Sequence, residues 1–191
     1  MRGLYRALLW LASAMGVGTI LVGVALASSG ANRASLSRST RTSGTCGVER
    51  WTVKTLQDRP HLLRARKTTI HYLITQPVPS SLPDTRLPFE RHVFTVVAAV
   101  VLVRHEDDSD LHLVLQSGGN HMIAEAPAPY CDRHATPVRR RQMRVARNHV
   151  RLCARARVTG VAFFDFDHGQ TGVAPNAIEL HSVLGFTCLT R

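Results

Sequence analysis

Apolar and polar residues alternate along several short stretches of this 191-residue chain, a pattern typical of β-strands. The stretch 93–103 is a nearly continuous run of β-branched and other apolar residues. The stretches 111–115 and 122–125 follow it, each after a turn sequence, EDDSD and SGGN. Two further stretches, 157–164 and 178–184, bracket a long polar loop. The pattern therefore predicts a three-stranded meander followed by two more strands.

A single long helix is predicted between the third and fourth of these strands. Thr136 is a good N-cap residue, and Pro137 suits the first turn of a helix. From there to about residue 155, apolar residues recur at helical spacing on one narrow face and arginines on the opposite face. The narrow face comprises Val138, Gln142, Val145, Ala146, His149, Leu152 and Cys153. The basic face comprises Arg140, Arg144, Arg147, Arg151 and Arg155.

Three strands, a helix and two strands, in this order, are the elements of the OB-fold, a five-stranded barrel. The predicted fold class is therefore mainly β and OB-fold-like, with one long α-helix between strands 3 and 4. In this fold the loop between the last two strands borders the usual ligand face. Before the barrel, the sequence predicts a strand over 48–55, a short helix over 68–74 capped by Thr68, and an extended proline-rich segment.

The N-terminal residues differ in composition from the rest of the chain. Residues 1–27 are interpreted as an export signal, because an apolar run follows Arg2 and Arg6 and ends in a small-residue cleavage site. The run approaches the length that spans a bilayer, so an uncleaved anchor is the alternative. Residues 28–44, rich in Ser, Thr, Arg and Gly, predict a flexible linker. Residues 45–191 then form a single domain with an N-terminal extension. We expect this domain outside the cytoplasm, secreted or associated with the cell envelope, with no transmembrane segment after signal cleavage.

The formal net charge of +11 and the isoelectric point near 10.9 come almost entirely from arginine. Guanidinium groups bind phosphates and carboxylates in a bidentate fashion, which favours an anionic polymer as the partner. Within the predicted helix, Arg144, Arg147 and Arg151 are the candidate contacts. The alternative is a solvated basic surface, because net charge alone does not define a site.

Four cysteines in an exported protein favour two disulfide bonds over a zinc site, and the chain has no CxxC spacing. Cys131 and Cys153 flank the predicted helix, which would be roughly 28 Å long. Bridged cysteines have Cα atoms within about 7 Å of each other, so a bond between these two is disfavoured. Two pairings of the four cysteines remain.

Four segments of the chain carry a resemblance: ERWTVKTLQD, EDDSDLHLVL, MIAEAPAPYC and VTGVAFFDFDHGQTGVAPNAIELHSVL. They are similar to segments of an uncharacterised family of small secreted bacterial proteins, and the string HGQTGVAPN followed by IELH is the most specific part. The resemblance covers residues 46–184 and implies one folded, extracytoplasmic domain. Family members have Pro where Ser182 stands in this chain. The family has no established activity, so the resemblance assigns no catalytic residues.

The resemblance also bears on the cysteines. Relatives that carry only the first two of them imply a bond between Cys46 and Cys131. Cys153 is then left to pair with Cys188.

Several polar side chains are predicted to lie on strands of the barrel. Glu179 and His181 are two residues apart and share a face of the last strand, as do Asp110 and His112 at the second strand. Glu125 comes from the third strand. If these faces converge, His112, Glu125, Glu179 and His181 form a set of ligands suited to Mg²⁺, Mn²⁺ or Zn²⁺. The alternative is a buried hydrogen-bonded network that holds the neighbouring loop.

The loop before the last strand supplies further candidates. His168 is suited to orienting a phosphate or to acting as a general base, and Phe166 is the best stacking residue. The candidate binding residues are Phe166, His168, Gln170, Asn176, Glu179 and His181. The loop matches neither a P-loop nor a dinucleotide fingerprint, and the chain has no GxSxG signature. The acidic turn 106–110 lacks the glycine and the terminal glutamate of a calcium loop, so it is interpreted as a solvated hairpin end.

The leading hypothesis is a secreted, OB-fold-like binding module for an anionic polymer, either nucleic acid or a cell-envelope polyanion. The alternatives are a metal-dependent phosphodiesterase or nuclease and a structural envelope protein without a ligand. No cofactor other than a divalent metal is expected, and the protein is expected to be a monomer. The choice between enzyme and binding module depends on whether the metal-site side chains meet.

Overall fold

The computed structural model describes residues 46–191. The predicted signal segment 1–27 and linker 28–44 lie outside the described residues. Among the residues described, no helix is long and apolar enough to cross a membrane.

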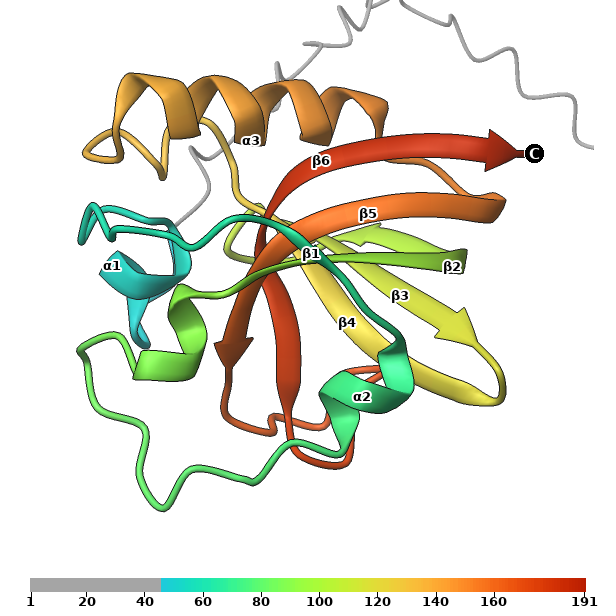
Figure 1. Ribbon diagram of the computed structural model, residues 1–191. Helices are drawn as coiled ribbons and strands as arrows, with labels where there is room; N and C mark the ends of the chain where they lie inside the picture. The colour runs from blue at the N-terminus through green and yellow to red at the C-terminus, as the bar shows by residue number, and fades with distance from the viewer. Residues whose placement is uncertain (1–45) are drawn as a thin grey trace, which may run out of the picture. The chain divides into compact units, whose positions relative to one another are not determined.

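Five strands form a closed barrel with the topology of an OB-fold, as the sequence predicted (Figure 1). They are β2 (Val93–His105), β3 (Leu111–Ser117), β4 (Asn120–Ala126), β5 (Cys153–Phe164) and β6 (Ile178–Thr190). Their order is β2-β3-β4-β6-β5, and β5 pairs again with β2 to close the barrel. All these pairings are antiparallel except that of β4 with β6. The short strand β1 (Arg66–Lys67) adds to β2 from outside in parallel orientation.

Strand β2 closes the barrel because it is long enough to pair with two partners. Its first part, from Val93 to Val100, pairs with β5, and its second part, from Ala99 to His105, pairs with β3. The register of both pairings shifts near Val100, and a bulge of this kind bends a strand. Inward side chains of the five strands form the main hydrophobic core.

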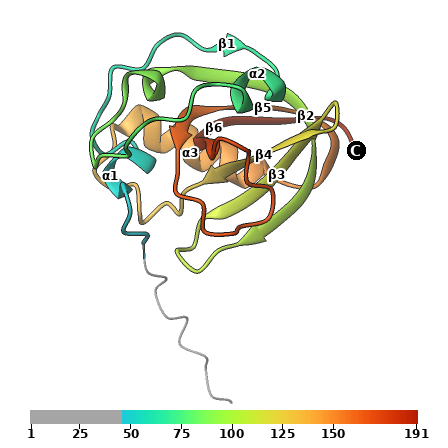
Figure 2. The same ribbon diagram turned by 90° about the horizontal axis from the view of Figure 1, so that it is seen from below.

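The long helix α3 (Pro137–His149) lies between β4 and β5 in the chain, as predicted. The side chain of Thr136 accepts a hydrogen bond from the backbone N–H of Arg139, which confirms the predicted cap. Figure 1 shows α3 along the top of the barrel and the β5–β6 loop at the bottom. Figure 2, seen from below, looks onto that loop.

The helix ends earlier than predicted, and its buried face shares only Ala146 with the predicted one. Because Cys153 already pairs with Val100 in the barrel, the chain leaves the helix after His149. Arg151 therefore lies beyond the helix and Arg155 lies in β5, so the predicted row of five arginines on one helical face is wrong. The buried residues of α3 are Met143 and Ala146, whereas the predicted core residues Val138 and Val145 are 66% and 50% exposed.

The segment 48–55 was predicted to be a strand, but it contains the short helix α1 (Trp51–Lys54). Arg50 has a left-handed backbone conformation (φ 49°), and its guanidinium donates to both carboxylate oxygens of Glu90 at 2.7 and 2.8 Å. It also donates to the carbonyl oxygen of Phe164 at 2.7 Å. These contacts with distant residues override the local alternation of apolar and polar residues.

Helix α2 (Ile70–Ile74) forms where a short helix was predicted, but its cap is Thr69 and not Thr68. The hydroxyl of Thr69 accepts a hydrogen bond from the N–H of Tyr72. The proline-rich segment that follows ends in a single 3-10 turn, Pro88–Arg91. The prediction that this segment has no helix therefore fails only at that turn.

Two disulfide bonds join Cys46 to Cys131 and Cys153 to Cys188, with Cα–Cα distances of 5.7 and 5.9 Å. This is the pairing that the family resemblance implied. The first bond fastens the beginning of the described chain to the segment before α3, and the second joins β5 to β6.

Candidate functional site

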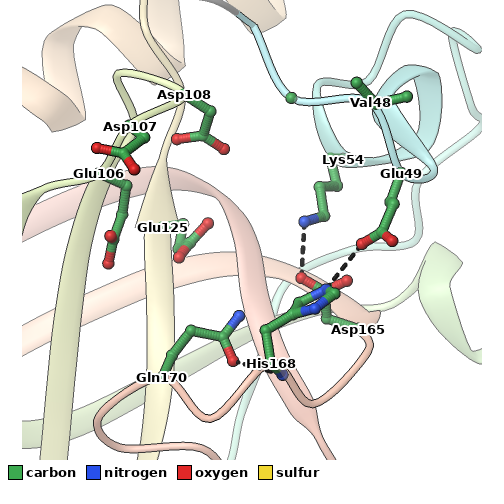
Figure 3. A pocket seen from close by; sticks show the side chains of 11 residues that line it. Val48, Glu49, Lys54, Glu106, Asp107, Asp108, Glu125, Asp165, His168 and Gln170 are labelled. Atoms are coloured by element: carbon green, nitrogen blue, oxygen red, sulfur yellow. Dashed lines mark hydrogen bonds and ion pairs between the residues drawn. The ribbon is translucent and has the colours of Figure 1, made fainter.

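A cavity of about 420 Å³ opens where the β2–β3 turn, the β5–β6 loop and residues 47–54 meet (Figure 3). In OB-folds the corresponding turn and loop form the usual ligand site. Its lining residues are Gly47, Val48, Glu49, Lys54, Glu106, Asp107, Asp108, Glu125, Asp165, His168 and Gln170. We call this cavity the acidic pocket, because six of these residues carry carboxylates.

Carboxylates gather at the acidic pocket although the protein as a whole is strongly basic. Behind Glu125, the buried residues Asp110 and Glu179 add two more to the six that line the cavity. Together these eight groups are most of the 13 acidic residues in the chain. A cavity of this charge attracts cations and repels phosphates.

Strand register places a row of three titratable side chains behind the acidic pocket, and Glu125 of this row lines the cavity. Glu125 of β4 pairs with His112 of β3 on one side and with His181 of β6 on the other. Paired residues on neighbouring strands point to the same face, so two imidazoles flank one carboxylate. All three residues are buried. The structure thus brings together three of the four predicted metal-site residues, and the fourth, Glu179, contacts His181.

His112 is held at both of its ring nitrogens. Its Nε2 lies 2.9 Å from the carbonyl oxygen of Thr171 in the β5–β6 loop. Its Nδ1 lies 3.0 Å from Oε1 of Glu125 and 3.2 Å from Oε1 of Glu106. Burial acts to lower the pKa of His112, but the hydrogen bonds to Glu125 and Thr171 outweigh it and raise the pKa above its ordinary value.

His181 is completely buried among three carboxylates. Its Nε2 lies 3.3 Å from Asp110, and its Nδ1 lies 3.2 Å from Glu125 and 3.7 Å from Glu179. Burial acts to lower the pKa of His181, but Asp110, Glu179 and Glu125 raise it to about 10. His181 is therefore an imidazolium at neutral pH, and a protonated ring does not bind a metal ion.

Glu179 is a buried carboxyl group close to another carboxylate, and both conditions disfavour its charged form. Burial and the charge of Glu125 raise the pKa of Glu179 to about 7, although His181 acts in the other direction. Its Oε2 makes no hydrogen bond within the described chain, and the same holds for Oδ2 of Asp110 and for both ring nitrogens of His181. Buried polar atoms without a hydrogen bond are rare in folded proteins. The contacts around His181 are thus charge contacts without hydrogen-bond alignment.

The rim of the acidic pocket carries two further ion pairs. Lys54 lies 2.6 Å from Asp165, and His168 lies 2.7 Å from Glu49 (Figure 3). The side chain of Gln170 accepts a hydrogen bond from the backbone N–H of His168 at 3.0 Å. The predicted binding residues His168 and Gln170 therefore do line the pocket.

The other two predicted loop residues lie differently. Phe166 is 40% exposed, and its ring centroid is 6.2 Å from that of His168. Asn176 is buried, and its amide donates to the carbonyl oxygens of Leu73 and Gln76 at 2.9 and 3.1 Å. It holds the β5–β6 loop against the end of α2 and does not line the acidic pocket.

Sequence reasoning missed part of this site. The turn 106–110 is not a solvated hairpin end: Asp110 is completely buried, and its Oδ1 accepts a hydrogen bond from the N–H of Ala128 at 3.0 Å. The signal was present, because Asp110 stands two residues before His112 on the same face. Lys54 and Asp165 carried no comparable signal, since they meet only through the tertiary fold.

The three predicted arginine contacts differ in their surroundings: Arg147 is half-buried, whereas Arg144 and Arg151 are exposed. Arg147 donates to the carbonyl oxygens of Ser109 and Ala126, so it fastens α3 to the β2–β3 turn and to the end of β4. Burial lowers the pKa of Arg147, and Asp110 acts to raise it. Arg151 donates to the carbonyl oxygen of His149 at 3.3 Å. Among the three predicted contacts, Arg144 is exposed on α3.

A different set of arginines lines a groove between α3 and the barrel. Two cavities of about 530 and 440 Å³ share Gln142, Leu184 and Gly185, and together we call them the α3 groove. Its basic lining residues are Arg64, Arg139, Arg141 and His149, and its apolar ones include Val138, Val145 and Phe186. No carboxylate belongs to the lining among residues 46–191.

Comparisons with known proteins give only structural similarities at low sequence identity. No family model matches the sequence, and no curated protein matches it. Among solved structures, a protein described as an aspartyl-tRNA synthetase from Leishmania major Friedlin is similar over 66% of this chain, with 12% identity and a TM-score of 0.43. An asparaginyl-tRNA synthetase from Entamoeba histolytica is similar over 68%, with 9% identity and a TM-score of 0.39. An aspartyl-tRNA synthetase from the same organism is similar over 69%, with 13% identity and a TM-score of 0.38. The similar regions span 21%, 24% and 26% of those three chains.

Proposed function

We infer that this protein is an extracytoplasmic OB-fold module that binds a phosphodiester-linked anionic polymer, and that the α3 groove is the binding surface. Nucleic acid and phosphate-containing polymers of the cell envelope share this chemistry. The extracytoplasmic location is supported by the predicted export signal over residues 1–27 and by the two disulfide bonds, which persist in oxidising compartments.

The observation that carries the proposal is the lining of the α3 groove. Arg64, Arg139 and Arg141 face a cavity without carboxylates, in a protein whose acidic residues gather elsewhere. Guanidinium groups form paired hydrogen bonds with phosphate oxygens. Burial lowers the pKa of Arg139, because its charge is partly removed from water, and a bound phosphate would restore a counter-charge.

The acidic pocket is a poor place for the same ligand. It occupies the usual OB-fold ligand position, but its six carboxylates repel a phosphate backbone. Lys54, its one lysine, is already paired with Asp165 at 2.6 Å. A polyanion therefore finds a favourable field at the α3 groove and an unfavourable one at the pocket.

The test compares two pairs of substitutions with the same change of charge. Arg64→Gln combined with Arg141→Gln removes two arginines of the groove, whereas Arg144→Gln combined with Arg151→Gln removes two outside its lining. Binding of a single-stranded oligonucleotide and of a glycerol-phosphate polymer is measured as a function of salt. Each lost phosphate contact lowers the slope of log K against log salt by about 0.7 for a single strand.

The groove pair should lower that slope by about 1.4, and the other pair should change it little. Equal effects of the two pairs would show that the polymer responds only to net charge. The polymer with the larger binding constant at the same salt concentration is the better ligand, which distinguishes nucleic acid from the envelope polymer.

The second candidate function is a metal-dependent phosphodiesterase, and the pairing of His112 with Glu125 beside the acidic pocket favours it. Cleavage of a phosphodiester substrate that is abolished by EDTA and restored by Mn²⁺ or Zn²⁺ would support this activity.

A further inference from the structure

We propose that Glu106, His112 and Glu125 bind one divalent metal ion at the inner end of the acidic pocket, with open coordination positions toward the cavity. This site is independent of polymer binding at the α3 groove, with which it shares no residue.

A carbonyl group of the β5–β6 loop fixes the orientation of the His112 ring. Its Nε2 lies 2.9 Å from the carbonyl oxygen of Thr171, and a carbonyl oxygen only accepts, so Nε2 carries a hydrogen. Nδ1 donates to Glu125 when the ring is protonated, and a metal ion would displace that proton and take the lone pair of Nδ1. Metal-binding histidines are oriented in this way, with the second ring nitrogen donating to a backbone carbonyl or a carboxylate.

Two carboxylate oxygens lie close to Nδ1 of His112. Oε1 of Glu125 lies 3.0 Å and Oε1 of Glu106 lies 3.2 Å from Nδ1 of His112. All three atoms lie within 4.8 Å of one another. Ligand atoms at about 2.1 Å from a metal ion are about 3.0 Å apart in octahedral and about 3.4 Å apart in tetrahedral coordination. The observed spacings fit such an arrangement without a change of fold.

A buried group of side chains next to these atoms is incompletely hydrogen-bonded. The second carboxylate oxygen of Glu125 contacts His181, which in turn contacts Asp110 and Glu179. In that group, Oε2 of Glu179, Oδ2 of Asp110 and both ring nitrogens of His181 have no hydrogen-bond partner within the described residues, and each residue is at least nine-tenths buried. Each of these atoms has a charged partner at 3.2–3.7 Å but no aligned hydrogen bond, and a nearby ion or water is one explanation of such atoms.

The negative charge of the acidic pocket also favours binding of a cation. Each local cation is already engaged with a carboxylate: Lys54 with Asp165, His181 with Asp110 and Glu125, and Arg104 with Oε1 of Glu106 at 2.8 Å. A metal ion bound at Glu106 would share this oxygen with the partly exposed Arg104 or displace it. Glu106, which is partly exposed, and the neighbouring Asp107 and Asp108 face the cavity and leave it with excess negative charge. A divalent ion bound to His112 and two carboxylates offsets that charge.

The donor set also indicates which ion fits. One imidazole nitrogen and two carboxylate oxygens suit Zn²⁺ or Mn²⁺, whereas Ca²⁺ requires six to eight oxygen ligands. Three protein ligands beside an open cavity of about 420 Å³ leave room for water or a ligand group on the metal.

The experiment uses the mature, disulfide-bonded chain, stripped with EDTA and dialysed, and titrates it with Zn²⁺ and Mn²⁺ in a calorimeter. Wild type should bind one ion. Glu106→Gln should weaken binding by at least about tenfold. Asp107→Asn is the matched control, because Asp107 lines the same cavity and bears the same charge but lies outside the ligand set. It should change the affinity less than threefold.

A second measurement does not depend on any variant. With ¹⁵N in the imidazole rings, Zn²⁺ should shift the Nδ1 resonance of His112 and leave the two nitrogens of His181 unchanged. Absence of binding at millimolar ion, or an equal loss of affinity in the two variants, would overturn the proposal. A Zn²⁺-induced shift at His181 in place of His112 would also overturn it.

Discussion

Glu125 is shared by two histidines of different character. His112 touches it from β3 and is fixed by a loop carbonyl, whereas His181 touches it from β6 and is surrounded by carboxylates. One carboxylate oxygen faces each imidazole. The same residue type therefore serves as a candidate metal ligand on one side and as a buried counter-charge on the other, because the neighbours differ.

Glu179→Gln should stabilise the metal-free protein at alkaline pH. The pKa of Glu179 is raised from 4.5 to about 7, mainly by burial, so its stabilising contribution is greatest below pH 4.5 and is lost as pH rises to about 7. The glutamine has no charge to bury and escapes this loss. Thermal melts in EDTA should show a higher midpoint than wild type at pH 8.5, and a smaller difference at pH 5.5. A lower midpoint at pH 8.5 would show that the carboxylate instead holds the loop.

His181→Gln should strongly destabilise the protein at pH 6. It leaves buried carboxylates without their counter-charge, and breaking a buried ion pair costs about 3–5 kcal/mol. Since the pKa of His181 is raised from 6.5 to about 10, its contribution is complete below pH 6.5 and lost as pH rises through 10. Urea unfolding in EDTA should therefore show a difference from wild type that shrinks between pH 6 and pH 10.

The exposed His121 provides the control, because His121→Gln should change the unfolding free energy little at either pH. A difference between wild type and His181→Gln that stays constant with pH would contradict the buried imidazolium.

Among the elements, the barrel strands could be predicted because each has one face in the core, and alternation of residue type records this directly. The end of α3 could not, since helical spacing continues by coincidence into β5, and pairing of Cys153 with Val100 decides the boundary. Helix α1 escaped prediction for a similar reason: Glu90 and Phe164, far away in the chain, hold Arg50 at its start.

The candidate site divides in the same way. The spacing of two residues between Glu179 and His181 placed both on one face, as the sequence indicated. Glu125 meets His181 because of the register between β4 and β6. Neither strand's sequence alone predicts that register. Glu106 was missed because an acidic turn ordinarily faces water, whereas here it folds toward His112.

Gly160→Ala should weaken the crossing of β5 over β6. A Cβ at this position would lie 2.8 Å from Cβ of Leu180 and 3.2 Å from the carbonyl oxygen of Ser182, so the strands would have to separate. Overpacking of this kind costs about 1–3 kcal/mol. Gly185→Ala is the control, because its Cβ would meet Thr159 at an ordinary 3.5 Å. Similar thermal midpoints for the two variants would contradict this account of the close approach.

Acidic and basic side chains gather at different sites on the molecule. The acidic pocket gathers six carboxylates, while the α3 groove is lined by arginines without any carboxylate among the described residues. Both features coexist in a chain of net charge +11. The overall charge therefore concealed that the usual OB-fold ligand position suits a cation and that an anion fits better beside the helix.

This division predicts that metal binding and polymer binding are nearly independent. The acidic pocket and the α3 groove share no lining residue, so no side chain lines both sites. The affinity for a single-stranded oligonucleotide should therefore change less than about threefold between EDTA and saturating Zn²⁺, in wild type and in Glu106→Gln alike. If Zn²⁺ strengthens binding more than tenfold in wild type but not in Glu106→Gln, the metal itself bridges to a phosphate. The polymer would then lie at the acidic pocket, and the α3 groove would lose its assigned role.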